Sequence, residues 1–235
     1  FVYYETLKNR YPNVRILTWK KEFNYSAINN FAVREARGEY LLFLNNDVEI
    51  ITESWLEEML QLCQQKDVGM VGAKLYYPDD TIQHAGVVVG LGGVAAHVLC
   101  KLPRDAEGYM GRLRCVQEIS AVTAACMIVK TSVFKAVGGF DEELKVAFND
   151  IDLCMKVRKY GVKIVFTPYA ELYHYESKSR GMEDTPEKQL RFSREVNCFR
   201  RKWERELLKG DPYYNPNLTL NNTDCSLRKQ EKNGD

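Results

Sequence analysis

This sequence lacks an excess of either charge, a paired cysteine motif and a long apolar run. Its formal net charge is +1, so no overall field favours an acidic partner, and we expect no nucleic-acid binding. The seven cysteines include no CxxC pair, which is typical of reduced, mostly buried thiols in a cytoplasmic protein. The longest apolar stretch, residues 87–99, is interrupted by glycine and histidine and is too short for a membrane span, which needs ~20 residues.

The chain also lacks a recognisable start. Its first residue is Phe1, and residues 2–9 have the pattern of a helix already under way, so we expect the sequence to be a piece of a longer protein. No glycine-rich, basic phosphate loop follows near the start. The 235 residues, 45% of them apolar, are enough for one domain with a sizeable core, or for one domain with an appendage.

Predicted strands and helices alternate through the first third of the chain. Residues 14–18 and 40–44 are rich in β-branched or other apolar side chains and predict strands, with a helix over 26–36 between them. A helix over 52–65 and a strand over 68–75 follow. This rhythm is typical of an α/β fold with a mainly parallel sheet flanked by helices.

Later in the chain the pattern is less regular. Residues 91–114 are rich in glycine and irregular, and a loop of this length is usually functional or mobile. A helix over 150–160 and a strand over 162–167, ended by Pro168, come next. A charged helix over 186–208 precedes a tail that we expect to be extended or frayed.

The residues around Asp47 carry the clearest chemical signal. An apolar run over 41–44 predicts a buried strand, and Asn45, Asn46 and Asp47 follow it directly. Ligands of open α/β sheets bind just past the carboxyl ends of strands, where a carboxylate can hold a hard cation and the cation can hold a diphosphate. Asn and Asp also favour turns, so these three residues alone are equally compatible with a simple turn.

Three further candidate sites also allow a purely structural interpretation. Asp150 and Asp152 begin a predicted helix, where a carboxylate can act as a general base or can cap the helix and meet its dipole. His174 lies just past a predicted strand, although a lone histidine is more often a surface or core residue than a ligand. Residues 177–181, which include Arg180, can wrap a phosphate, but short basic loops are usually only solvated.

The order of these clusters resembles the family-2 glycosyltransferases, the inverting enzymes of the GT-A fold. The similar stretches lie within residues 12–182 and comprise 24–30 (NYSAINN), 36–47 (ARGEYLLFLNND), 124–127 (AACM), 137–142 (VGGFDE), 149–154 (NDIDLC) and 174–177 (HYES). The resemblance implies a GT-A-like α/β domain over residues 1–182, followed by a C-terminal helix and extended tail over 183–235. It also implies that the family's first nucleotide-binding strand is missing from this chain and would precede Phe1.

The resemblance implies a metal site. Asn45, Asn46 and Asp47 fall on the Asp-x-Asp position that binds Mg²⁺ or Mn²⁺ and the donor diphosphate. Asn45 there is a neutral and weaker replacement for the first acid, so Asp47 is expected to be the principal carboxylate on the metal. His174 falls where some members supply a second metal ligand.

The resemblance implies further roles in catalysis and donor binding. Asp150 matches the catalytic base, and Asp152 matches a second, supporting acid. Asn29 stands where many members carry an arginine, and Asn29, Asn30 and Arg180 are expected to contact the donor.

Together these roles imply an inverting glycosyltransferase. It would move a hexosyl or deoxyhexosyl group from a UDP- or dTDP-sugar to a hydroxyl of a glycan or lipid-linked acceptor, in cell-surface polysaccharide synthesis. We expect a cytoplasmic location, at the inner face of the membrane through the longer protein. Because base and ribose contacts come largely from the strand before Phe1, we expect this chain alone to bind the donor weakly, to be weakly active or inactive, and to self-associate through an open sheet edge.

Two other classes of function stay open at this point. A non-catalytic carbohydrate-binding or scaffolding module is compatible with the same resemblance. A nucleotidyltransferase can use a similar sheet and metal carboxylate, but it usually has a glycine-rich basic loop near its start, and this sequence has none there.

Overall fold

The computed structural model describes residues 2–176 and 185–229. The helices are α1 (Val2–Arg10), α2 (Tyr25–Glu35), α3 (Trp55–Cys63), α4 (Thr131–Ala136), α5 (Asn149–Tyr160), α6 (Pro186–Lys202) and α7 (Glu204–Lys209). The strands are β1 (Tyr40–Leu44), β2 (Val48–Ile50), β3 (Val68–Tyr76), β4 (Ile82–His84), β5 (Val87–Val89), β6 (Ala95–His97), β7 (Gln117–Glu118), β8 (Cys126–Lys130) and β9 (Lys163–His174). Two short 3₁₀ helices, η1 (Leu91–Gly93) and η2 (Tyr109–Arg114), lie in the glycine-rich segment.

The central sheet has the strand order β1-β8-β3-β9-β2, with β4 paired to β3 and β7 paired to β9. β8 is antiparallel to its neighbours β1 and β3, and β3 is parallel to β9, so β1, β3 and β9 share one direction. β5 and β6 form a separate antiparallel pair. The expected α/β class, with a central sheet flanked by helices, is confirmed, and the sheet is mixed.

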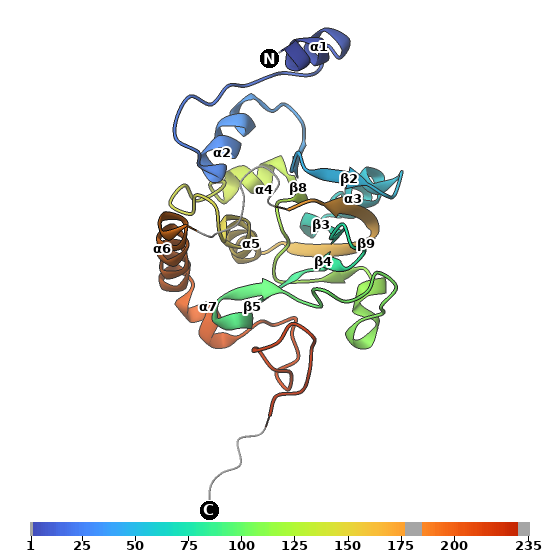
Figure 1. Ribbon diagram of the computed structural model, residues 1–235, viewed down its shortest axis with the longest axis vertical. Coiled ribbons are helices and arrows are strands. Elements are labelled where there is room, and N and C mark those ends of the chain that lie inside the picture. The colour runs from blue at the N-terminus through green and yellow to red at the C-terminus, as the bar shows by residue number, and fades with distance from the viewer. Residues whose placement is uncertain (1, 177–184, 230–235) are drawn as a thin grey trace, which may run out of the picture.

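Helices cover both faces of this sheet. Figure 1 shows α2, α4, α5 and α6 gathered on one side. Successive residues of a strand point to opposite faces, so the fully buried β3 supplies Met70 to the apolar cluster of these helices and Val71 to the cluster that contains Trp55 and Met59 of α3. Burial on both faces explains why β3 is apolar without alternation in the sequence.

Two predicted strands differ from the structure. Residues 14–18 form no strand, because β-branched side chains favour a strand only where it packs and pairs, and this segment is largely exposed. The strand expected to end at Pro168 instead continues as β9 to His174. The pairing of β9 with β3 shifts register between Phe166 and Glu171, and a proline without an N–H is tolerated at such an irregularity.

The C-terminal region packs on the same core as the sheet. The single helix expected over 186–208 is divided at Trp203, whose side chain is buried, into α6 and α7. The tail that follows turns back on itself and buries Tyr214, Leu218 and Cys225. The expectation of an extended or frayed tail is therefore wrong for residues 210–229.

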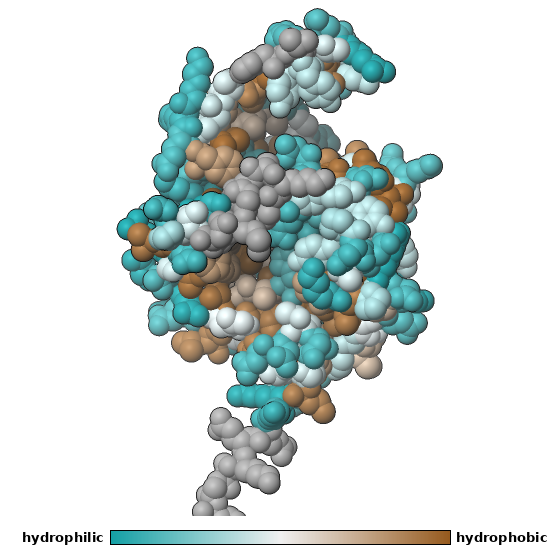
Figure 2. Space-filling view, viewed as in Figure 1, coloured by the Kyte–Doolittle hydropathy of each residue, from teal (hydrophilic) through white to brown (hydrophobic). Residues whose placement is uncertain are grey.

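The upper part of the molecule in Figure 1 is more open. α1 stands away from the body, and most of its side chains are exposed. β1 ends the strand order and pairs only with β8 among the described strands, and its Leu42 and Leu44 are exposed. Figure 2 shows further apolar surface toward the side of the view where β2 and α3 lie, and these elements expose Ile50 and Leu56.

Two further features concern the cysteines and the length of the helices. All seven cysteines are free, and four of them are buried. Within residues 2–176 and 185–229, no helix combines the length and apolar character that crossing a membrane requires.

Candidate functional site

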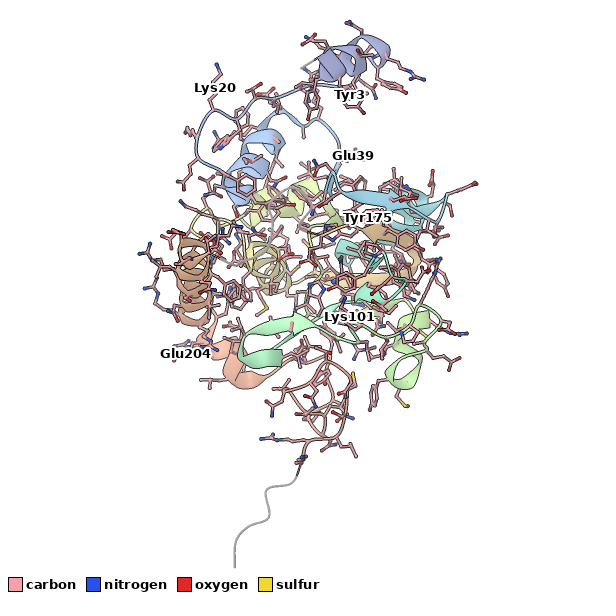
Figure 3. All side chains as sticks on the ribbon, viewed as in Figure 1. Tyr3, Lys20, Glu39, Lys101, Tyr175 and Glu204 are labelled. Atoms are coloured by element: carbon pink, nitrogen blue, oxygen red, sulfur yellow. The ribbon has the colours of Figure 1, made fainter. Side chains whose placement is uncertain are left out.

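The connection between β1 and β2 lies where two parts of the chain meet. The Asn45 N–H donates to the carbonyl of Ala125 at 2.9 Å, which holds the start of this connection to the segment before β8. The Tyr175 N–H donates to the carbonyl of Asp47 at 2.8 Å, which holds its end to the last residues of β9. Tyr175 is labelled in Figure 3 and marks this end of β9. The polar residues 45–47 therefore lie past the carboxyl end of β1 and against the carboxyl end of β9.

This arrangement brings Asp47, His174 and Asn45 together. The Oδ1 atom of Asp47 lies 3.3 Å from Nε2 of His174. The side-chain amide of Asn45 donates to the same Nε2 atom at 3.1 Å. Val48 faces His174 directly in the β2–β9 register, so the pairing of these two strands fixes the approach of Asp47.

A residue that the sequence did not single out orients the imidazole. Gln83 of β4 is 3% exposed, and its Oε1 accepts a hydrogen bond from Nδ1 of His174 at 2.6 Å. The Nε2 of Gln83 donates to the main-chain carbonyl of His174 at 3.1 Å. No sequence signal marks a lone glutamine in a three-residue strand, so only the structure reveals this contact.

The Asp47 carboxylate has no compensating charge in the described part of the chain. Its side chain is 14% exposed, and Oδ1 is buried without a hydrogen-bond partner. Burial lowers the pKa of His174 against the opposing effect of the Asp47 carboxylate, so the ring is neutral at pH 7. Among residues 2–176 and 185–229, no lysine or arginine forms an ion pair with Asp47.

These features suit a divalent cation. Buried carboxylates are normally paired with a charge or bound to a metal. Two adjacent ligands of an octahedral Mg²⁺ or Mn²⁺ ion lie about 3 Å apart, close to the separation of Asp47 Oδ1 and His174 Nε2. In the described residues, no cluster of three or more His, Cys, Asp or Glu side chains forms a complete metal site, so other ligands would come from Asn45 and from a bound phosphate.

Asp150 lies on the other side of the segment that holds Asn45. Its half-buried carboxylate accepts the N–H of Ala124 at Oδ2, 3.1 Å away, and the N–H of Ile151 at Oδ1, 2.9 Å away. Ala124 precedes Ala125, whose carbonyl accepts from Asn45. Each oxygen of Asp150 therefore keeps capacity to accept another proton donor.

Tyr25, the first residue of α2, lies beside this carboxylate. Its hydroxyl donates to the carbonyl of Ala124 at 3.3 Å. Burial and the nearby negative charge of Asp150 both raise the pKa of Tyr25, so the hydroxyl stays protonated. Tyr25 belongs to the NYSAINN stretch, so a sequence motif marks it, although it is not among the site residues expected from the sequence.

The turn before Asp150 has an unusual backbone. Phe148 occupies the N-cap position of α5 with φ +61°, in the left-handed region that a bulky residue rarely adopts. Its ring packs on Phe192 and Phe199, with centroid distances of 5.7 Å and 5.4 Å. Neither Asn149 nor Asp150 is the N-cap, so capping alone does not explain the carboxylate.

Asp152 has different surroundings from Asp150. It is fully buried, and its Oδ1 accepts the indole N–H of Trp203 at 2.8 Å. Two ammonium groups flank it, Lys202 at 2.8 Å from Oδ1 and Lys156 at 3.4 Å from Oδ2. Asp152 therefore joins α5 to the end of α6, and the structure does not bring it to Asp47.

The structure brings the residues that are expected to contact the donor less clearly together. Asn29 donates to the carbonyl of the first residue of α2 at 2.8 Å. Asn30 donates to the carbonyl of Phe140 at 2.9 Å and accepts its N–H at 3.0 Å, so it joins α2 to the segment before α5. Asn46 is exposed. Arg180 lies outside the described residues.

Two cavities beside the C-terminal helices and tail lie away from these residues. One of about 600 Å³ is lined by residues of α5, α7 and the tail, including Arg158 and Trp203. Another of about 1080 Å³ is lined by α7 and the tail, between Leu207 and Lys229. None of the candidate residues within the described ranges lines either hollow, so size alone does not locate the chemistry.

Comparison with known proteins identifies relatives of this arrangement. "Uncharacterized protein y4gI" of Sinorhizobium fredii is 57% identical over 215 residues, which cover 91% of this chain and 24% of that protein. "O-antigen biosynthesis protein RfbC" of Myxococcus xanthus is 43% identical over 225 residues, which cover 95% of this chain and 17% of that protein. The chain thus spans less than a quarter of the length of these two relatives.

The fold is shared with a solved glycosyltransferase. GalNAc-T7, crystallised with UDP, GalNAc and Mn²⁺, superposes with a TM-score of 0.64 at 13% identity, covering 87% of this chain and 39% of that one. At this identity the likeness shows the fold, which is the GT-A fold expected from the sequence. The model of the family described as "Glycosyltransferase like family" matches residues 12–195, and the chain therefore belongs to that glycosyltransferase family.

Proposed function

We propose that this chain is the catalytic domain of an inverting glycosyltransferase that uses a nucleotide-diphosphate sugar and a divalent cation. The observation that carries the proposal is the partly buried Asp47 carboxylate, which faces the neutral His174 imidazole and has no compensating cation among residues 2–176 and 185–229. A charge in this position is costly unless a bound ion offsets it.

In this proposal Asp47 and His174 hold Mg²⁺ or Mn²⁺, with Asn45 as a neutral third group. The amide of Asn45 now donates to His174 Nε2, so it must turn away for that nitrogen to bind a cation. When bound, the cation stabilises the negative charge that develops on the leaving nucleoside diphosphate. The presence of Mn²⁺ and UDP in the GalNAc-T7 crystal supports this assignment.

Asp150 is the proposed base. Its carboxylate takes the proton of an acceptor hydroxyl while that oxygen forms a bond to the anomeric carbon of the donor. The bond from the anomeric carbon to the diphosphate breaks, and its electron pair leaves with the diphosphate. The N–H groups of Ala124 and Ile151 hold Asp150 in place, and attack from one side with departure from the other inverts the anomeric centre.

The wider role follows from the relatives. We propose that the longer protein builds a cell-surface polysaccharide from a UDP- or dTDP-sugar on a glycan or lipid-linked acceptor, because RfbC is an O-antigen biosynthesis protein. We assign transfer to residues 1–182 and a supporting role to 183–235, at the cytoplasmic face of the membrane. Donor binding by Asn29, Asn30, Asn46 and Arg180 belongs to the same proposal.

Hydrolysis of the donor separates an enzyme from a non-catalytic carbohydrate-binding module. UDP- and dTDP-sugars are incubated with the longer protein and with this chain, in Mn²⁺ and then in EDTA, and the released nucleoside diphosphate is measured. We expect Mn²⁺-dependent release by the longer protein and weak release by the chain. The exposed Glu53→Gln variant is the control for removal of an acidic side chain. Donor binding without release by the longer protein would favour the module.

A further inference from the structure

We infer that Gln83 is a positioning residue, which fixes the proton of His174 on Nδ1 and thereby leaves on Nε2 the lone pair that would bind the cation. The inference rests on the proposed function and extends it from the proposed metal ligands to the residue that orients one of them, His174. Its basis is the pair of hydrogen bonds between the buried Gln83 amide and His174.

The hydrogen bond from Gln83 to the His174 carbonyl fixes which end of the Gln83 amide faces the imidazole ring. The main-chain carbonyl of His174 can only accept, so the group of Gln83 that faces it at 3.1 Å must be the amide nitrogen. The other end of the amide, at 2.6 Å from Nδ1, is then the oxygen, which can only accept. Nδ1 must therefore carry the proton, and in a neutral ring Nε2 is left with its lone pair.

Gln83 is itself held firmly. It lies in β4, between Ile82 and His84, which pair with the central strand β3. Its main-chain carbonyl accepts a hydrogen bond from Nδ1 of His97 at 2.9 Å. The side chain is 3% exposed, so water does not compete for either end of the amide.

The opposite tautomer would close the site. With the proton on Nε2, the ring would donate to Asp47 Oδ1 across the present 3.3 Å and give that buried carboxylate a charge-assisted hydrogen bond. With the proton on Nδ1, the Asp47 oxygen and the His174 Nε2 atom both present lone pairs, and these two residues would hold a cation. The present hydrogen bond from Asn45 to Nε2 joins two neutral groups. A cation that binds Nε2 therefore replaces a weaker bond than the charge-assisted bond of the opposite tautomer.

Two variants of similar size separate tautomer control from packing. Gln83→Met removes both hydrogen bonds. Gln83→Glu removes the donation to the His174 carbonyl but keeps an acceptor for Nδ1–H, and a carboxylate is a common partner of metal-bound histidines. Thermal melts of the metal-free proteins check folding, and Gln83→Asn, which withdraws the amide by one methylene, replaces Gln83→Met if that variant does not fold.

The first measurement needs no metal. Long-range ¹H–¹⁵N spectra of the ring nitrogens show which one is protonated, and the chain has only three histidines to assign. We expect the proton on Nδ1 of His174 in the wild type and in Gln83→Glu, and a mixture or the Nε2 form in Gln83→Met. An unchanged Nδ1 form in Gln83→Met overturns the inference, whether or not the wild type binds a metal.

The second measurement is Mn²⁺ affinity, from the electron paramagnetic resonance of free Mn²⁺ during titration. We expect Gln83→Met to bind 10–100-fold more weakly than the wild type and Gln83→Glu to stay within about threefold of it. Equal weakening in both variants would reduce Gln83 to a packing residue. Absence of Mn²⁺ binding by the wild type would instead contradict the proposed cation site, and the ring spectra would still decide the role of Gln83.

Discussion

Asp47 and Asp152 are both largely buried carboxylates, but their surroundings are opposite. Asp152 is fully buried between the ammonium groups of Lys156 and Lys202 and accepts the indole N–H of Trp203. Asp47 is 14% exposed and faces the neutral ring of His174. Within the described residues each carboxylate leaves one buried oxygen without a hydrogen-bond partner, so the contrast lies in the neighbouring charges. The first charge is compensated by two lysines, whereas the part of the chain that the structure describes offers no cationic partner for the second.

The difference separates two uses of the same side chain. A compensated carboxylate ties helices together, and removing its charge leaves the neighbouring cations less well compensated. An uncompensated carboxylate costs stability in the free protein and is retained where a ligand offsets the charge. Stability and ligand binding should therefore respond in opposite ways at Asp152 and Asp47.

The largest effect on stability is expected for Asp152→Asn. The amide removes the charge that Lys156 and Lys202 share, and we expect the free energy of unfolding to fall by about 3–5 kcal/mol. Urea unfolding, monitored by circular dichroism, measures this change. Mn²⁺ affinity of the folded fraction should remain that of the wild type, and a loss of affinity would show that the two carboxylates do not act separately.

Asp47→Asn should reverse this pattern. Loss of the ligand charge is expected to weaken Mn²⁺ binding and metal-dependent transfer by ~100–1000-fold in the longer protein. The new amide carries no charge that needs compensation, so the metal-free chain should gain about 1 kcal/mol of stability. Mn²⁺ titration and urea unfolding of the same preparation test both signs. A destabilised Asp47→Asn chain would mean that an unrecognised partner compensates this charge.

Asp150→Asn adds a third carboxylate to the comparison of Asp47 with Asp152. Asp150 is half-buried and, within the described residues, is hydrogen-bonded only to two main-chain N–H groups. The amide keeps the size of the side chain but removes the proton acceptor. We expect kcat of the longer protein to fall ~100-fold or more, while Mn²⁺ affinity is retained. Unchanged kcat would leave Asp150 with a purely structural role at the start of α5.

The sequence predicted these features unequally. Strands such as β1 and β3 and helices such as α3 and α5 were found because long apolar runs and helical spacing are local properties. The failed strand over 14–18 and the extension of β9 past Pro168 depend on partner strands, which no local pattern describes.

The same limit applies to the candidate site. Asn45, Asp47 and His174 were found through short motifs that follow apolar strands, and the structure brings them together. Gln83 was missed because its role depends on β4 lying beside the end of β9, a contact across 91 positions of the chain. The divergent surroundings of Asp150 and Asp152 were also hidden, since Trp203 and Lys202 come from a distant helix.

The smallest effect concerns pH and tests whether the histidines near Asp47 are neutral. Burial, reinforced by the nearby His97 and His174 rings, holds the pKa of His84 well below its ordinary value, and burial also lowers that of His174. The unfolded chain therefore binds more protons than the folded chain as the pH falls below about 6.5. Stability is complete above that pH and is lost below it, by at most ~1.4 kcal/mol per pH unit for each histidine.

Urea unfolding of the wild type and of His84→Gln between pH 8 and pH 5 measures this slope. Carboxylates with lowered pKa values, such as Asp141, lose their contribution only nearer their ordinary range of about 4, so the two processes are separable. We expect the free energy of unfolding of His84→Gln to fall with decreasing pH about half as steeply as that of the wild type. At pH 8, where the histidines are neutral in both states, this effect of protonation should be absent. A wild-type chain that becomes no less stable toward pH 5 would mean that a protonated histidine compensates Asp47, and the contrast with Asp152 would disappear.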